Sequence, residues 1–222
     1  MGKMIKIIAE AGCNWRTFDE AFDFIYQSKR LGLFATKFQI FNKELIKDNQ
    51  NFLKLQDLIL DKEDVAELFY YGQEIDQEVF FTPMYPEAVD WLEELQIPYY
   101  KLRYLDRWNM ELTTKILETN KPLFISFNYN ESIYLENIHK NIIPLFCIPE
   151  YPAKIDFFPF SIRYGFNDHY KGISNHNGLE LLKICLEHQR YEYHECHVML
   201  DGTEPLENDW SVSFSELKEV LK

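Results

Sequence analysis

Polar and charged side chains stand near the ends of most short apolar runs in this 222-residue chain. Glu10 ends the first run, Lys37 and Lys101 lie near the ends of the second and fourth, and His169 and His197 end the last two. Strand interiors rarely hold lysine unless it is paired or functional. Imidazoles on neighbouring strand ends suit a divalent ion and leave positions open for substrate. The pattern therefore predicts an anion pocket beside a metal site.

Each of these residues also has a purely structural explanation. Glu10 is either a substrate-binding or proton-handling carboxylate or a solvated turn residue, and Lys37 is either functional or an inward cation paired with a carboxylate such as Glu10. The two histidines are either ligands of one ion or two unrelated, partly buried side chains. Thr82 and Ser126 on neighbouring strand ends favour the functional alternative, because hydroxyls and lysines together bind phosphate or carboxylate.

The other histidines fall on predicted helices or loops, and we expect them at the surface: His139, His176, His188 and His194. Two acidic residues beside the metal candidates, Asp168 and Glu195, are expected as their hydrogen-bond partners.

The apolar runs alternate with amphipathic, helix-like stretches, and this alternation predicts an α/β fold, a single-domain (β/α)8 TIM barrel. In that fold the active site lies where the strands end. The predicted strands are Met4–Glu10, Phe34–Phe41, Val79–Phe81, Pro98–Leu102, Pro122–Phe127, Ile142–Ile148, Ser161–Phe166 and Tyr193–Met199. The predicted helices are Phe18–Leu31, part of Asn42–Leu60, Asp61–Ile75, Pro86–Leu95, Asn109–Thr119, Glu131–His139, Gly178–His188 and Ser213–Leu221.

Composition narrows the possible partners and compartment. The net charge of −13 and the pI near 4.9 argue against nucleic acid or an anionic membrane as a partner. The four cysteines form no CxxC pair, which indicates a reducing compartment, and we expect a cytoplasmic protein. The first apolar run is too short for a signal peptide, and no run approaches the roughly 18 apolar residues of a membrane span.

Several motifs, in collinear order over nearly the whole chain, resemble the sialic acid synthase family, the phosphoenolpyruvate-dependent N-acetylneuraminate synthases and their relatives. These motifs are IAEAGCNW ending at Trp15, ATKFQIF (Ala35–Phe41), FFTPMYPEAVDWLEELQIPYYKL (Phe80–Leu102), KPLFIS (Lys121–Ser126), PLFCIPEYPA (Pro144–Ala153), YGFNDHYKGI (Tyr164–Ile173), ECHVMLDG (Glu195–Gly202) and ENDWSVSFSELKEVL (Glu207–Leu221).

The resemblance implies a (β/α)8 barrel that condenses phosphoenolpyruvate with a sugar aldehyde such as N-acetylmannosamine and releases phosphate. It implies that His169 and His197 hold a Mn²⁺ or Mg²⁺ ion that polarises the aldehyde. The implied phosphoenolpyruvate-binding residues are Lys37, Thr82, Lys101 and Ser126; the implied sugar-binding residues are Glu10, Gln39 and Asp209, with Tyr151 in a matching loop. Asp106 falls where the family has a glutamate near the reacting carbon, and we expect Asp106, Glu10 and Lys101 to act there.

The sequence also departs from the family pattern. Arg103-Tyr104-Leu105 replaces a small Gly-Ser-Gly-type stretch whose serine contacts phosphate. We expect the separate C-terminal antifreeze-like domain, with its sugar-binding arginine, to be absent. We also expect either a homodimer or a partner chain that supplies the missing domain. Bulky replacements around the pocket suggest an acceptor that differs from N-acetylmannosamine or is smaller.

The leading expectation is therefore a metal-dependent synthase of nonulosonic-acid-like 2-keto acids. Two alternatives stay open. One is a related aldolase or phosphosugar enzyme with another acceptor. The other is a degenerate barrel that binds a ligand or serves as a partner subunit.

Overall fold

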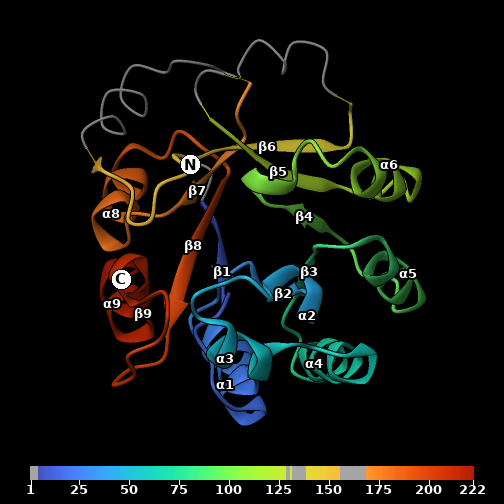
Figure 1. The fold of residues 1–222 in the computed structure, drawn as a ribbon. Coiled ribbons are helices and arrows are strands. Elements are labelled where there is room, and N and C mark those ends of the chain that lie inside the picture. Colours follow the sequence, from blue (N-terminus) through green and yellow to red (C-terminus); the bar gives the residue numbers. More distant parts are fainter. Residues whose placement is uncertain (1–4, 129–130, 132–138, 156–168) are drawn as a thin grey trace.

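Eight parallel strands form a closed barrel in the computed structural model, which describes residues 5–128, 131, 139–155 and 169–222. Neighbours in the barrel are neighbours in sequence, and β8 closes the ring by pairing with β1 (Figure 1). The barrel strands are β1 (Lys6–Glu10), β2 (Ala35–Ile40), β3 (Val79–Pro83), β4 (Tyr100–Leu102), β5 (Leu123–Phe127), β6 (Ile142–Phe146), β7 (Gly172–Asn175) and β8 (Tyr193–Met199). A short strand, β9 (Val212–Ser213), pairs with the end of β8. The predicted (β/α)8 TIM barrel is confirmed.

Helices surround the ring of strands (Figure 1). Among the described residues, those with seven or more residues are α1 (Phe18–Arg30), α4 (Lys62–Glu74), α5 (Pro86–Glu94), α6 (Met110–Glu118), α8 (Leu179–His188) and α9 (Phe214–Val220). The long connection after β2 holds α2 (Lys43–Ile46), α3 (Phe52–Leu55) and a 3-10 helix (Gln56–Leu58), and two further 3-10 helices span Tyr104–Asp106 and Asn208–Trp210. Each of the six longer helices matches a helix predicted from the sequence. The predicted helix Glu131–His139 lies mostly outside the described residues.

Local signals in the sequence fix several helix starts. Thr17 caps α1 by accepting a hydrogen bond from the backbone N–H of Glu20. Asp61 and Asp64 form a capping box at the start of α4, and Ser213 with Glu216 form another at the start of α9. These caps satisfy backbone donors that the first helical turn leaves without partners.

The barrel interior is layered, and the layers place the polar residues. Successive side chains on a strand point to opposite faces, so residues two apart share the inner face. An apolar layer fills the amino-terminal part of the interior with Ile8, Ala35, Phe80, Phe124, Leu145 and Tyr193. Two residues further along the same strands stand Glu10, Lys37, Thr82, Ser126 and Glu195, and all are at least 95% buried. The polar layer therefore lies at the carboxyl ends of the strands, in contact with a packed layer of aliphatic and aromatic side chains.

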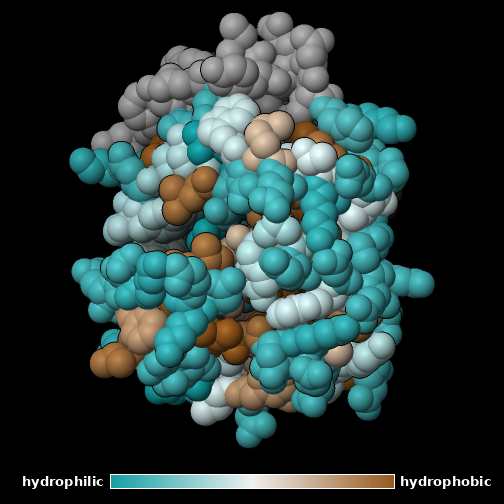
Figure 2. Space-filling view, turned by 45° about the vertical axis from the view of Figure 1, so that its right-hand side comes forward, coloured by the Kyte–Doolittle hydropathy of each residue, from teal (hydrophilic) through white to brown (hydrophobic). Residues whose placement is uncertain are grey.

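A second, larger apolar core lies between the strands and the surrounding helices, and includes Phe24, Phe38, Leu68 and Leu92. On the face shown in Figure 2, hydrophilic residues dominate the surface and hydrophobic residues form small patches between them. No helix among the described residues combines the length and the apolar character that a membrane span requires.

The seventh strand does not lie where the sequence pattern placed it. The predicted strand Ser161–Phe166 falls outside the described residues, and the strand that pairs with both β6 and β8 is β7 (Gly172–Asn175). His169 therefore precedes the seventh strand, and the residue that follows its carboxyl end is His176. The expectation that His169 ends strand seven is wrong.

His194 makes folding sensitive to acid. Its ring is 1% exposed on the outer face of β8, where Nε2 lies 3.1 Å from the side-chain amide of Asn175. Burial lowers the pKa of His194 to about 3. Between about pH 6.5 and pH 3 the unfolded chain binds a proton that the folded chain excludes, so the free energy of unfolding falls as the pH drops through this window.

We expect His194→Gln to reduce this pH dependence by up to about 1.4 kcal/mol per pH unit. Urea unfolding at pH 7, 5.5 and 4 measures the difference, and His188→Gln at the end of α8 serves as the control. Parallel pH profiles for His194→Gln and the parent protein would contradict the prediction.

Candidate active site

A cavity of about 260 Å³ opens at the carboxyl ends of the strands. It is lined by Glu10, Lys37, Gln39, Lys101, Arg103, Tyr104, Leu105, Ser126, Tyr151, Ser174, His176, Glu195, His197, Glu207 and Trp210. The strands supply the deep residues, and the loops after β4, β6 and β8 supply those at the mouth. This is the position at which barrels of this class carry their active sites.

Lys37 lies at the centre of the first cluster. Its Nζ donates a hydrogen bond to Thr82 Oγ1 at 2.8 Å and forms an ion pair with Glu10. Gln39 Nε2 donates to the other carboxylate oxygen of Glu10 at 2.9 Å. Lys37 is therefore paired with a carboxylate and also lines the cavity, so the structural and the functional explanations do not exclude each other.

Lys101 forms a matching cluster on the next two strands of the barrel, β4 and β5. Its Nζ donates to Ser126 Oγ at 2.8 Å and to the backbone carbonyl of Leu102 at 2.9 Å, and the residue is 2% exposed. Strand register explains the arrangement, because β4 and β5 are adjacent and parallel. In both clusters the lysine thus donates to one of the strand-end hydroxyls that were expected to form an anion pocket with it.

Glu195 lies between the two lysines. Its Oε1 is 3.7 Å from Lys37 Nζ and its Oε2 is 3.6 Å from Lys101 Nζ. Burial alone would raise the pKa of Glu195, but Lys101 and Lys37 hold it below its usual value. Burial also lowers the pKa of Lys37 to about 7, although the charge of Glu195 opposes this shift. An anion that enters here meets two ammonium groups and competes with Glu195 for them.

Two imidazoles form the other side of the cavity. The ring centroids of His176 and His197 are 5.6 Å apart. His176 Nδ1 lies 3.0 Å from the backbone carbonyl of Ile148, and His197 Nδ1 lies 2.9 Å from Glu207 Oε2. A carbonyl or a carboxylate only accepts hydrogen bonds, so each Nδ1 carries a proton, and the lone pair of either ring in its neutral form lies on Nε2. Burial, together with the neighbouring His197, lowers the pKa of His176 to about 4 and keeps it neutral near pH 7.

The structure corrects three of the predicted site residues. His169 is exposed in the turn before β7 and does not line the cavity. Asp209 is exposed on the 3-10 helix after β8 and does not line it either. Asp106 points its carboxylate at Arg103, with Nε–Oδ2 and Nη2–Oδ1 distances of 2.6 and 3.1 Å, and also stays outside the lining.

The other predicted residues lie at or against the cavity. Glu10, Lys37, Gln39, Lys101, Ser126, Tyr151 and His197 line it, and Thr82 is fully buried behind it as the partner of Lys37. Tyr151 covers one side of the mouth, where its ring packs 4.3 Å from the ring of His176 and 5.4 Å from that of Trp210.

Four lining residues were not predicted as part of the site: His176, Glu207, Trp210 and Ser174. Spacing could have revealed His176. The predicted helix after it begins at Gly178, and most strand-to-helix loops in such folds have 2–6 residues. A strand that ended at Phe166 would leave a longer connection, which favours a strand over 172–175 instead.

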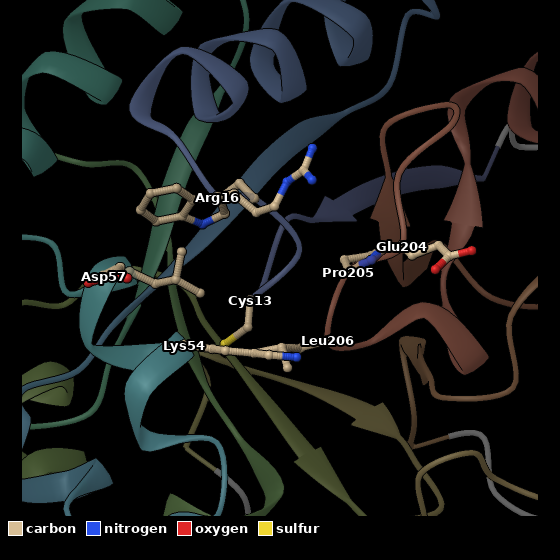
Figure 3. Close-up of a pocket in the computed structure, with 9 residues that line it drawn as sticks. Cys13, Arg16, Lys54, Asp57, Glu204, Pro205 and Leu206 are labelled. Atoms are coloured by element: carbon tan, nitrogen blue, oxygen red, sulfur yellow. The ribbon is translucent and has the colours of Figure 1, made fainter.

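Two further cavities lie beyond the first, one directly next to it and one further out. One, of about 300 Å³, shares Gln39, Arg103, Glu207 and Trp210 with it and is walled by apolar residues such as Phe41, Leu55 and Met84. The outer one, of about 250 Å³, shares Cys13 and Leu206 with the second cavity and is drawn in Figure 3. Its rim carries Arg16 and Lys54 but also Asp57 and Glu204, so its charges are mixed. The site therefore extends outward between the loops after β1, β2 and β8.

Comparisons with known proteins define the class and then the family. The barrel is similar to the crystal structure of an N-acetylneuraminic acid synthetase from Leptospira borgpetersenii, with a TM-score of 0.85 at 22% identity, covering 98% of this chain and 81% of that one. The family model described as "NeuB family" matches residues 4–220. The chain belongs to the NeuB family, which confirms the resemblance to sialic acid synthases.

Two curated relatives show how far the similarity extends. A functionally uncharacterised protein of Methanocaldococcus jannaschii is 27% identical over 193 residues, 78% of this chain and 57% of that protein. The N,N'-diacetyllegionaminic acid synthase of Campylobacter jejuni is 26% identical over 192 residues, 77% of this chain and 56% of that protein. The chain thus spans little more than half the length of these relatives.

Proposed function

We propose that this protein condenses phosphoenolpyruvate with a sugar aldehyde similar to N-acetylmannosamine, giving a nonulosonic 2-keto acid and inorganic phosphate. Membership of the NeuB family and the similarity to a legionaminic acid synthase support this reaction class. The observation that carries the proposal is the cavity itself, in which two buried lysine–hydroxyl clusters face two imidazoles.

The lysine clusters are suited to the phosphate and carboxylate groups of phosphoenolpyruvate. Lys37 and Lys101 approach the same space from strands β2 and β4, and Thr82 and Ser126 hold the two ammonium groups at 2.8 Å. Buried lysines with fixed positions bind anions strongly because little water screens them. The net charge of −13 makes these local cations necessary for an anionic substrate.

The two imidazoles fit a divalent ion, Mn²⁺ or Mg²⁺. Both Nδ1 atoms have the carbonyl or carboxylate partners that usually orient metal-binding histidines, and this leaves Nε2 of each neutral ring as the nitrogen that would bind the ion. Within the described residues no group of three or more His, Cys, Asp or Glu side chains forms a metal site. In the proposal His176 and His197 are the protein ligands and substrate or water fills the other positions. The ion would act as a Lewis acid on the acceptor aldehyde.

The acceptor would extend from the imidazoles into the second cavity. Glu207 and Gln39 line both cavities, so the sugar hydroxyls meet hydrogen-bonding groups along this path. Asp106 does not reach the cavity, and the proton-handling role predicted for it passes in this proposal to Glu195 or Glu10, which line it.

The proposal also includes a partner for the chain and a cellular compartment. Leu105 and Tyr151 line the cavity but keep 71% and 50% of their surface exposed, which favours closure of the mouth by a second copy or a partner chain. All four cysteines are free, which is consistent with the reducing cytoplasm.

Product analysis tests the proposal. The protein is incubated with phosphoenolpyruvate, Mn²⁺ and a panel of aldehydes that includes N-acetylmannosamine. Phosphate release is then measured together with the mass of any new 2-keto acid. We expect release that requires an acceptor and a product that contains the carbon atoms of both substrates. Binding of phosphoenolpyruvate and Mn²⁺ without product from any acceptor would favour the degenerate barrel.

A further inference from the structure

We propose that Glu207 is a positioning residue for His197: it keeps the imidazole proton on Nδ1 and reserves Nε2 for a ligand in the cavity. The inference rests on the metal site of the proposed function. It concerns a residue of the loop after β8, two positions before the aspartate that the sequence motifs had indicated.

The contact between the two side chains is short and shielded from solvent. His197 Nδ1 and Glu207 Oε2 are 2.9 Å apart, with side chains 8% and 15% exposed. The carboxylate has only acceptor capacity when ionised, so the proton of this hydrogen bond belongs to Nδ1.

The turn after β1 fixes the position of Glu207 at two points. Glu207 Oε2 accepts a hydrogen bond from the backbone N–H of Cys13 at 3.2 Å, and the backbone N–H of Glu207 donates to Asn14 Oδ1 at 3.1 Å. Asn14 in turn donates to the backbone carbonyl of Val198 at 2.7 Å and to Ser211 Oγ at 2.8 Å. The carboxylate therefore has one defined place, set by elements at opposite ends of the sequence.

Gly12 leaves the space that the carboxylate occupies. A Cβ at this position would lie 2.2 Å from Glu207 Oε2 and 3.3 Å from Glu10 Oε1, and the backbone φ of +50° favours glycine. A larger residue at position 12 would push the carboxylate away from His197. The glycine and the glutamate thus act on the same imidazole.

Three variants separate the hydrogen bond from the charge and from general loop effects. Glu207→Ala removes both, Glu207→Gln keeps a carbonyl oxygen that can accept from Nδ1, and Asp209→Ala changes an exposed acid in the same loop. Histidine ¹⁵N resonances of the metal-free protein report the tautomer of His197, assigned by their absence in His197→Gln. Mn²⁺ affinity follows from electron paramagnetic resonance titration.

We expect Glu207→Ala to lose the Nδ1–H tautomer and to weaken Mn²⁺ binding by about 10- to 100-fold. Glu207→Gln should restore the tautomer and most of the affinity, and Asp209→Ala should match the parent protein. Gly12→Ala should shift the His197 resonances in the same direction as Glu207→Ala. Thermal unfolding of each variant confirms that it is folded before the spectra are compared.

An unchanged His197 tautomer in folded Glu207→Ala would overturn the inference. So would an equal loss of Mn²⁺ affinity in Asp209→Ala. The tautomer readout needs neither metal nor substrate, so it decides the role of Glu207 even if the parent protein binds no Mn²⁺, a result that would count against the proposed metal site alone.

Discussion

Replacing His176 with alanine is expected to weaken Mn²⁺ binding by more than about 100-fold and to abolish acceptor-dependent phosphate release. The reason is geometric, because His176 directly follows β7 and its ring lies 5.6 Å from that of His197 inside the cavity. In the proposed metal site, removal of one of the two imidazole ligands leaves a single protein ligand. Metal titration and a phosphate-release assay on the same preparation measure both effects.

His169→Ala is the matched control, since this histidine is exposed before β7 and outside the cavity lining. We expect its Mn²⁺ affinity and activity to stay close to those of the parent protein. The reverse pattern, with loss in His169→Ala and none in His176→Ala, would contradict the assignment.

Lys101→Met is expected to weaken phosphoenolpyruvate binding by about 10- to 100-fold, because a hydrogen bond to a charged partner contributes about 1.5–3 kcal/mol. The methionine keeps much of the side-chain volume but removes the ammonium group that Ser126 holds at 2.8 Å. It also leaves Glu195 with one lysine instead of two, which adds repulsion toward an incoming anion. Calorimetric titration with phosphoenolpyruvate measures the change.

Lys121→Met is the control for Lys101→Met. Lys121 precedes β5, pairs with Glu93 at 2.6 Å and does not line the cavity. The Lys121→Met protein should bind phosphoenolpyruvate with the affinity of the parent protein. Equal affinities in Lys101→Met and the parent protein would place the anion elsewhere.

The barrel and its polar layer could be predicted because both follow from local patterns. Apolar runs with a polar residue at the inward position near their ends predict strands, and parallel strands bring those ends together. Lys37 and Lys101 were therefore recognised as inward cations, and β1, β2 and β8 begin and end within two residues of their predicted bounds.

The position of the seventh strand was harder to predict from the sequence than the positions of β1, β2 and β8, because β7 has only four residues, Gly172–Asn175. A short strand whose second half is Ser174-Asn175 offers little apolar signal, and the aromatic run upstream matched a strand better. The motif resemblance then placed the metal ligand at His169 rather than His176. The short connection from the seventh strand to the helix that follows it was the stronger constraint.

Loop residues were the least predictable part of the site. Glu207 and Asp209 are both acidic and two positions apart, and no periodicity separates them in an irregular segment. Their difference arises from the fold, since Gly12, Cys13 and Asn14 hold Glu207 against His197 while Asp209 stays exposed. Contacts between residues almost 200 positions apart cannot be predicted from a local sequence pattern.

The most direct test of a single cavity for metal and phosphoenolpyruvate is the ³¹P resonance of phosphoenolpyruvate with the Mn²⁺-loaded protein. A Mn²⁺ ion held by His176 and His197 would lie across the same cavity from Lys37 and Lys101. We predict strong paramagnetic broadening of the phosphoenolpyruvate signal, which disappears in His176→Ala and in Lys101→Met but persists in His169→Ala. A sharp signal in the presence of bound phosphoenolpyruvate and bound Mn²⁺ would contradict the account.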